Sequence, residues 1–235
     1  GYKGLGTITV TGGTFTAKGT NAAIKAYDYA DMNESKFTVP ETVSVSGGTF
    51  SSPVDETLCA NGFIPTSTTE DGVTTYGVKK GSYVASVTTA EGTVTKYETL
   101  AEAAKAVVNS KLKGATVALL TDVDLGTKAL SFYGGPADIT LDLGGHTLTS
   151  ANTSTVDLTT TGLTIQNGTI KNTRSGAPTP STGALYVTIS SSTTLKNLKV
   201  ESTTYGILFR FNKGVGIVTV EDGVEITGAV EGVRV

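Results

Sequence analysis

Apolar and polar residues alternate along short stretches of this chain, and one phrase of eight residues with this pattern recurs. Two alternate apolar positions are followed by a pair of Gly or Asn residues and then by another apolar position. Alternation turns one face of each strand inward, and Gly and Asn tolerate the positive φ of a sharp corner. The phrase therefore predicts one corner of a coiled solenoid. Its copies are Ile8–Phe15, Val43–Phe50, Leu141–Leu148 and Leu163–Ile170.

Looser copies of the phrase begin near Val117, Leu195 and Val218. From residue 117 onward the starts are about 22 to 32 residues apart, a suitable length for one coil. A second strand in each coil is predicted where short apolar stretches follow the phrase. We expect seven coils in a row, with neighbouring strands parallel. The second strands are expected at Ala22–Ala26, Gly183–Val187, Gly206–Phe209 and Gly232–Val235.

One segment departs from the solenoid pattern. Thr99 and Glu102 have the spacing of a capping box, in which each side chain satisfies an amide at the start of a helix. An apolar stripe follows, and Gly114 is the expected left-handed stop. Just upstream, Tyr83–Val87 and Thr93–Tyr97 flank a turn and predict a hairpin. Hairpin and helix together are expected to cover one end of the solenoid.

Composition narrows the class of partner. The 235 residues are rich in Thr, Val, Ser and Gly, and the formal net charge of -3 argues against nucleic acid or an anionic membrane surface. Cys59 is the single cysteine, which excludes an internal disulfide. No apolar run approaches the roughly 20 residues of a membrane helix, so we expect no membrane insertion. The chain begins at Gly1 without a signal peptide, and we interpret it as a piece of something longer.

Three segments resemble the opening of right-handed parallel β-helix modules of the pectate-lyase-like fold: Tyr97–Lys105, Gly114–Val123 and Ile139–Leu148. Val43–Ser52, followed by Cys59–Phe63, is similar to the closing coil of such a module. The resemblance implies a repeat module of large secreted or cell-surface proteins of anaerobic Gram-positive bacteria. We therefore expect an all-β protein, a right-handed parallel β-helix with one short capping α-helix near residues 99–113. Pectin-degrading relatives carry catalytic Asp pairs, or an Arg and a Lys together with carboxylates that bind calcium. No motif in this sequence matches either set.

The order of these parts predicts open ends. Residues 1–80 carry the closing coils and exit segment, whereas residues 81–235 carry the hairpin, capping helix and opening coils. We expect both chain ends to form open solenoid edges that pair head to tail with other copies or with adjacent modules of a tandem array. A rival arrangement folds residues 1–50 onto the last coil of the same chain, with residues 63–81 as an extended connector of up to roughly 60 Å. The expected edge residues are Ile8, Val10, Phe15, Val233 and Val235.

Candidate chemical residues are few. His146 lies in a predicted corner, where we interpret it as a structural residue that tolerates positive φ. Asp28, Asp31 and Glu34 are oxygen donors of a kind that calcium accepts, although a solvated acidic loop is the simpler interpretation. The acid pairs available for glycoside hydrolysis are Asp122 with Asp124 and Asp142 with Asp157.

Two surface chemistries have a weaker basis. Flat aromatic rings stack on sugars, but core or ladder packing explains most of the rings here better. Thr7, Thr9 and Thr11 face outward as in threonine-faced ice-binding solenoids. Other coils place Gln166, Lys196, Glu221 and Ser44 at comparable positions, so no regular threonine ladder is expected. The rings in question are Tyr27, Tyr29, Tyr186, Tyr205, Phe209 and Phe211.

These observations predict a non-enzymatic structural or adhesive module, extracellular and secreted or held at a cell surface, that assembles end to end into a fibre. We expect no catalytic residue, cofactor or metal. The alternative is a carbohydrate-active enzyme of the lyase or hydrolase type, or a glycan-binding β-helix, with a cell-surface glycan as partner.

Overall fold

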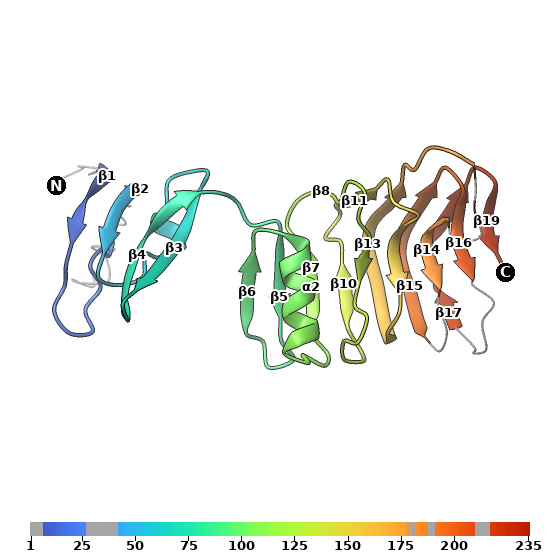
Figure 1. Ribbon diagram of the computed structural model, residues 1–235, viewed down its shortest axis with the longest axis horizontal. Coiled ribbons are helices and arrows are strands. Elements are labelled where there is room, and N and C mark those ends of the chain that lie inside the picture. The colour runs from blue at the N-terminus through green and yellow to red at the C-terminus, as the bar shows by residue number, and fades with distance from the viewer. Residues whose placement is uncertain (1–6, 27–41, 178, 180–181, 188–190, 210–216) are drawn as a thin grey trace, which may run out of the picture. The chain divides into compact units, whose positions relative to one another are not determined.

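The computed structural model describes residues 7–26, 42–177, 179, 182–187, 191–209 and 217–235 (Figure 1). The chain divides into two compact units, Gly1–Ser82 and Tyr83–Val235. Strands make up 53% of this all-β structure, which contains a β-solenoid of about four turns and, in the described part, one α-helix. The predicted fold class is confirmed.

The solenoid lies in the second unit, where the main sheet stacks one strand from each coil (Figure 1). Neighbouring coil strands are parallel, so equivalent residues of the phrase lie in register. Val117, Leu141, Ile165 and Leu195 form an inward column that is fully buried. Alternating apolar residues thus form the core that the pattern predicts. The strands are β7 (Thr116–Leu119), β10 (Thr140–Asp142), β13 (Thr161–Asn172), β15 (Ser192–Ser202) and β17 (Ile217–Val220).

Beyond the corner, the chain of each coil continues as a further parallel strand. β11 pairs with β8 and β13, and β18 pairs with β15. Here Leu148, Ile170 and Val200 make a second buried column. β13 and β15 run through the corner without interruption. The short strands are β8 (Val123–Asp124), β11 (Thr147–Ser150) and β18 (Glu225–Gly228).

A second parallel sheet closes the other side of the coils. Its inward column includes Val156, Leu185 and Ile207, which are almost completely buried. Second strands are confirmed at three of the four predicted places. They belong to a sheet of β9 (Leu130–Ser131), β12 (Ser154–Leu158), β14 (Gly183–Val187), β16 (Tyr205–Phe209) and β19 (Glu231–Arg234).

The beginning of the solenoid is capped. β5 (Ala85–Thr88) and β6 (Val94–Tyr97) form the predicted hairpin, and β5 pairs antiparallel with β7. Helix α2 (Leu100–Asn109) packs Leu100 and Val107 into the core. The Thr99 half of the capping box is confirmed, since the Glu102 amide donates to the Thr99 hydroxyl. The Glu102 carboxylate accepts a hydrogen bond from that hydroxyl.

The helix ends earlier than predicted. It stops at Asn109 rather than near residue 113, with Ser110 as its C-cap. Lys111 has a φ of 52°, so the left-handed residue comes before Gly114, which also has a positive φ of 70°. Because a lysine is not an expected left-handed residue, the sequence pattern pointed to the glycine instead.

The first unit has two parallel strands, β1 (Thr7–Phe15) and β2 (Thr42–Phe50). The Phe15 and Phe50 rings stack with their centroids 5.0 Å apart. The short 3₁₀ helix η1 (Glu56–Leu58) follows β2. β3 (Phe63–Glu70) and β4 (Val73–Lys80) form an antiparallel hairpin, and β4 also pairs with β2.

Three expectations about the first unit need correction. The expected seven-coil row is wrong, because β1 and β2 form a sheet with the β3–β4 hairpin, separate from the solenoid. Residues 63–81 are not an extended connector, since most of them pair within that hairpin. Ala22–Ala26 is not a strand. The segment beside it in the next coil, Pro53–Leu58, contains the 3₁₀ helix η1 and therefore does not provide an extended strand with which Ala22–Ala26 could pair.

The sheet contains a threonine column that we did not expect. Gln166, Lys196 and Glu221 lie at the outward position after the inward residue, and Ser44 lies beside Thr9. The threonines occupy the outward position before the inward residue. β-Branched cross-strand neighbours stabilise a sheet by mutual packing. The aligned residues are Thr116, Thr140, Thr164, Thr194 and Thr219.

Candidate functional site

The last coil of the second unit is an open end, which we define as β17, β18 and β19. Within the described residues, each of these strands pairs on one side only. Val220 is 50% exposed and Val233 is 47% exposed, whereas their counterparts one coil earlier, Leu195 and Ile207, are 0% and 1% exposed. The open end therefore presents core-type side chains and unpaired strand edges to solvent.

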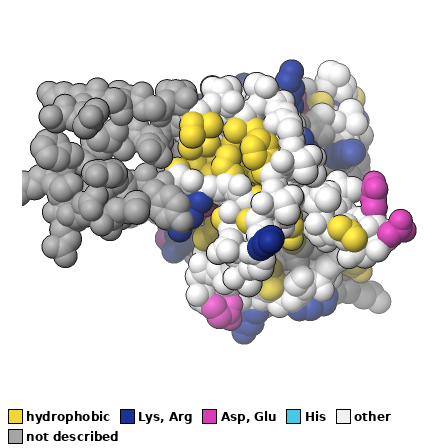
Figure 2. Space-filling model, turned by 90° about the vertical axis from the view of Figure 1, so that its left-hand side faces the viewer, with side chains coloured by type: hydrophobic (Ala, Val, Ile, Leu, Met, Phe, Trp, Pro, Cys, Tyr) yellow, Lys and Arg dark blue, Asp and Glu magenta, His cyan; other side chains and the backbone are white. Residues whose placement is uncertain are grey.

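The first unit has a comparable surface at β1, which we call the β1 edge. β1 is the outer strand of its sheet and pairs only with β2 among the described residues. Ile8 is 56% exposed, Val10 is buried, and Phe15 is partly buried against the core of the unit. Figure 2, viewed from this side, shows apolar side chains gathered in a patch.

Four of the five residues predicted to form assembly edges lie on the strands of these two surfaces. Ile8, Val10 and Phe15 lie on β1. Val233 lies on β19, and Val235, which follows β19, is largely exposed. The second unit's open end also includes exposed Ile217, Val220 and Val230, which the sequence reasoning did not single out. For Val220 the signal was the alternation of Val218 and Val220, which repeats the inward pattern of the preceding coils.

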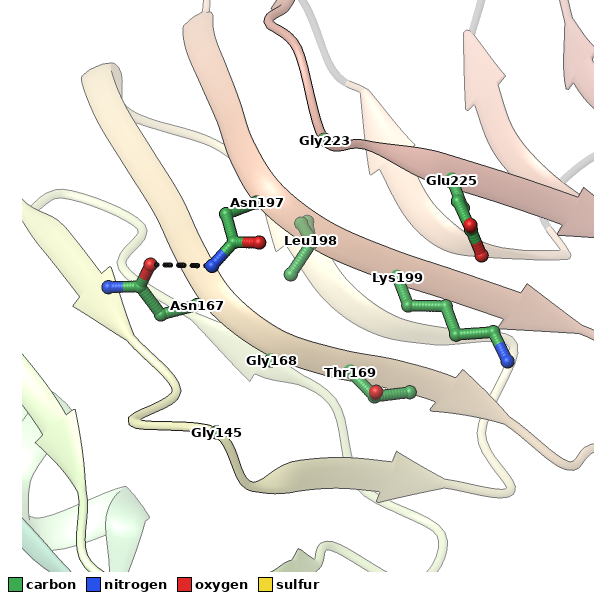
Figure 3. Close-up of a pocket in the computed structure, with 9 residues that line it drawn as sticks. All are labelled: Gly145, Asn167, Gly168, Thr169, Asn197, Leu198, Lys199, Gly223 and Glu225. Atoms are coloured by element: carbon green, nitrogen blue, oxygen red, sulfur yellow. Dashed lines mark hydrogen bonds between the residues drawn. The ribbon is translucent and has the colours of Figure 1, made fainter.

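A shallow groove of about 400 Å³ follows the solenoid corner, and we call it the corner groove (Figure 3). The Asn197 side-chain amide donates to the Asn167 side-chain oxygen at 3.2 Å. Both asparagines have positive φ, 40° and 61°. Lys199 and Glu225 from adjacent strands also line the groove. The groove presents amide, ammonium and carboxylate groups over glycine backbone.

Charges beside the corner groove are paired within β15 and between β15 and β13. Lys199 Nζ lies 2.6 Å from Glu201 Oε1, and Lys171 Nζ lies 3.7 Å from Glu201 Oε2. The hydrogen bond from Lys199 lowers the pKa of the Glu201 carboxyl, and the Lys171 ammonium acts in the same direction. The same hydrogen bond raises the pKa of Lys199. Both shifts favour the charged forms.

Three of the candidate acids near the corners accept hydrogen bonds from the backbone. Asp124 accepts from the Gly126 amide, and Asp122 accepts from the Thr147 amide of the next coil. Asp142 accepts from the Gly144 amide and, with its second oxygen, from the Gln166 and Asn167 side-chain amides. These contacts hold the corners and join successive coils.

Asp157 is the fourth candidate acid. It lies on β12, in the second sheet, and accepts a hydrogen bond from Ser154. Asp142 lies on β10 of the main sheet. The two members of this proposed pair therefore belong to different sheets of the coil.

His146 lies at a corner, as predicted, but it does not take the positive φ that we assigned to it. Gly144 and Gly145 adopt the left-handed conformations instead, with φ of 57° and 85°. The His146 Nδ1 atom lies 3.5 Å from Asp122 Oδ1. Because these two adjacent glycines supply the positive φ that the corner needs, His146 does not have to adopt it.

The suggested calcium ligands Asp28, Asp31 and Glu34 lie outside the described residues, and so do Tyr27, Tyr29 and Phe211. Where the structure is described, no three His, Cys, Asp or Glu side chains gather as a metal site. Burial raises the pKa of the Cys59 thiol, and the Cys59 Sγ lies 3.7 Å from the Asp55 carbonyl oxygen. Burial is therefore the main influence on this thiol.

Two of the candidate aromatic residues are packed rather than displayed. Tyr186 and Tyr205 form a buried cluster with Leu208 on the outward side of the second sheet. The Arg234 guanidinium lies 4.8 Å from the centre of the Tyr205 ring and donates a hydrogen bond to its hydroxyl. These rings offer no flat surface for a sugar, which agrees with the ladder interpretation.

The helices in the described parts of the chain are too short or too polar to span a membrane. A comparison with known protein families, with curated proteins and with solved structures finds no match for this chain.

Proposed function

We propose that this chain is a non-enzymatic structural and adhesive module of an extracellular protein, extended by end-to-end stacking of its coils. The observation that carries the proposal is the open end of the solenoid. Unpaired strand edges act as templates for further strands, and natural proteins normally cover or blunt them. Here the edge also exposes valines at inward core positions.

The two ends of the solenoid differ in a way that supports directional growth. The β5–β6 hairpin and α2 cover the beginning, since β5 pairs antiparallel with β7 and the helix adds its apolar face to the core. The last coil has no comparable cover among the described residues. A partner that continues the parallel ladder would satisfy the strand amides and bury the exposed valines.

The non-enzymatic part of the proposal draws support from the acids. Asp122, Asp124 and Asp142 serve as acceptors for backbone or amide groups that hold the corners together. A glycosidase needs two carboxyl groups facing one scissile bond across a cleft. Because these carboxylates already accept hydrogen bonds that hold the corners, they are less suited to act as the two catalytic groups of a glycosidase.

The extracellular setting of the proposal rests on the sequence resemblance to pectate-lyase-like modules of bacterial surface proteins. A threonine- and serine-rich solenoid with a single cysteine suits a module of this kind. An adhesive role would use the long outward faces of the coils, where polar and charged side chains alternate with the buried columns.

Sedimentation velocity over a range of protein concentrations tests the stacking. We expect the wild-type chain to form species whose mass rises with concentration. Val220→Lys should abolish this growth, because a docked coil would bury the ammonium without a partner. Val94→Lys is the matched control: Val94 is an exposed valine on the capping hairpin, and this variant should associate as the wild type does. A wild-type chain that stays monomeric at the highest concentration would refute the proposal.

The corner groove favours glycan binding as a second candidate. Its Asn, Thr, Lys and Glu side chains are of the kinds that hydrogen-bond sugar hydroxyl and carboxylate groups, and they come from successive coils (Figure 3). Binding to an array of acidic polysaccharides, compared between the wild-type chain and Lys199→Ala, tests this candidate. Binding that is lost in the variant would support it, and no binding by the wild type would dismiss it.

A further inference from the structure

Gly12 and Gly47 occupy the same position in two copies of the repeated phrase, but their surroundings differ. A Cβ atom added at Gly47 would lie 2.3 Å from the Thr11 carbonyl oxygen of the neighbouring coil. A Cβ atom added at Gly12 would meet no described atom within 4 Å. Neither glycine has a positive φ. Gly47 is therefore required by the coil stacked on it, whereas nothing described in the structure requires Gly12.

The requirement at Gly47 comes from one side only. β1 lies on the side of β2 that precedes it in the coil order, and the clash at Gly47 is with β1. In the second unit the close approach falls one position later in the phrase: a Cβ added at Gly168 would lie 2.5 Å from the carbonyl oxygen of His146 in the preceding coil, and the position equivalent to Gly47 is Asn167. A corner glycine with an ordinary φ, as at Gly47 and Gly168, thus accompanies close approach by the preceding coil. At Gly12 that coil is missing from the described structure.

We infer that the missing coil is the open end of a second copy of this chain, docked on the β1 edge. This inference rests on the proposed end-to-end assembly and names its partner surface and register. The open end and the β1 edge both belong to ladders of parallel strands. The β1 edge carries a copy of the repeated phrase, so β1 can pair with the open end as the strand of a further coil would.

The phrase itself sets the register of the contact. The spacing from Val10 to Phe15 equals that from Leu195 to Val200, so β1 fits the ladder as another β15 would. β15 places Leu195 beside Val220 and Val200 beside Ile226. Between copies, Val10 therefore lies beside Val220, and Phe15 lies beside Ile226.

The threonine column continues through the same register. Thr194 lies beside Thr219 in the second unit, and Thr9 lies beside Ser44 in the first. Docking in the inferred register places Thr9 of one copy beside Thr219 of the other. Inward and outward columns then both run on without a break, which is the condition for regular cross-strand packing.

The caps favour a head-to-tail contact. In the second unit the hairpin and helix lie at the beginning of the ladder, and in the first unit the β3–β4 hairpin follows β2. The second unit is thus capped at the beginning of its ladder and open at the end. The first unit is open at the beginning, at β1, and is followed by a hairpin at the end. Two identical open ends related by a two-fold axis would instead run antiparallel and break the parallel register.

Two variants, alone and mixed, test this inference. Gly12→Ala should remain folded, with an unchanged thermal midpoint in dilute solution, because its methyl group meets no described atom in the isolated chain. It should fail to self-associate, since the added Cβ would collide with a docked coil that approaches Gly12 as β1 approaches Gly47. Val220→Lys should also be monomeric. An equimolar mixture should form a dimer that grows no further, because each variant keeps one working surface.

Gly47→Ala serves as the comparison variant, since the same substitution at the covered position should lower the thermal midpoint of the isolated chain. Light scattering reads the masses. Self-association of Gly12→Ala, or a mixture that stays monomeric, overturns the inferred partner while leaving assembly itself intact if the wild type associates. A wild type that never associates refutes the proposed function as well. A wild type that never associates would also favour the rival arrangement, in which residues 1–50 fold onto the last coil of the same chain.

Discussion

At the scale of single residues, the solenoid corner at Asn167 and Gly168 divides two tasks between neighbouring residues. Asn167 takes a φ of 61°, which turns the chain. Gly168 keeps an ordinary φ but allows close approach, because a Cβ there would lie 2.5 Å from both the His146 carbonyl oxygen and the Leu143 Cβ. The two residues are therefore not interchangeable, although either type suits a turn.

Gly168→Ala should destabilise the second unit by about 1–3 kcal/mol, the usual cost of forcing a methyl group into a packed site. Urea unfolding followed by circular dichroism measures the change. Gly12→Ala is the control, because it has both space and an ordinary φ, and its effect should be neutral or slightly stabilising. Equal effects of the two substitutions would contradict the account of the corner.

The candidate acids show where prediction from sequence stops at this scale. Asp142 could be recognised as an acid at the end of a strand. Its contacts with Gln166 and Asn167 could not, because they join two coils and depend on the exact register between them. The same limit applies to Asp122, whose amide partner lies on the next coil.

At the scale of elements, parallel register brings charges of opposite sign together. Lys171 on β13 lies beside Glu201 on β15, and Lys199 lies two residues before Glu201 on the same outward face. The pKa of Glu201 lies below its ordinary value of 4.5 in the folded chain. Folding therefore favours the ionised carboxylate over the protonated acid.

This linkage predicts how Glu201→Gln changes stability with pH. The contribution of the Glu201 carboxylate is fully present above pH 4.5 and is lost as the pH falls through the lower, folded-state pKa. The variant should melt slightly below the wild type at neutral pH, and the two should converge in acid. Calorimetry across this range measures the difference, which should shrink in 1 M salt because the pair is at the surface. A difference that grows in acid would contradict the assignment.

Elements with a local signal were predictable, whereas those that depend on a neighbour were not. The capping box placed the start of α2 correctly at Thr99, because its hydrogen bonds lie within three residues. The helix end was misplaced, since Lys111 rather than Gly114 first adopts a left-handed conformation. Ala22–Ala26 has an apolar pattern, but a strand also needs a ladder partner, and η1 occupies the adjacent chain.

At the scale of the whole molecule, the repeated phrase occurs in both units but has a different neighbour in each. In the second unit five coil strands stack in parallel from β7 to β17, whereas in the first unit β2 is followed by an antiparallel hairpin. The phrase predicted parallel coils. By itself the phrase gives no division into two units, because an inward apolar residue looks the same whether the next coil belongs to the same unit, another unit or another molecule. The boundary expected between residues 80 and 81 came from the order of the closing and opening segments instead.

The central claim is that the open end and the β1 edge become paired strands when copies meet. Hydrogen–deuterium exchange measures this pairing directly, through the amides of β1, β17 and β19. In dilute solution these amides should exchange quickly, and at high concentration they should become protected, while the central strand β13 and the capping strand β6 do not change. Protection that is independent of concentration, or that appears at β6 instead, would contradict the account.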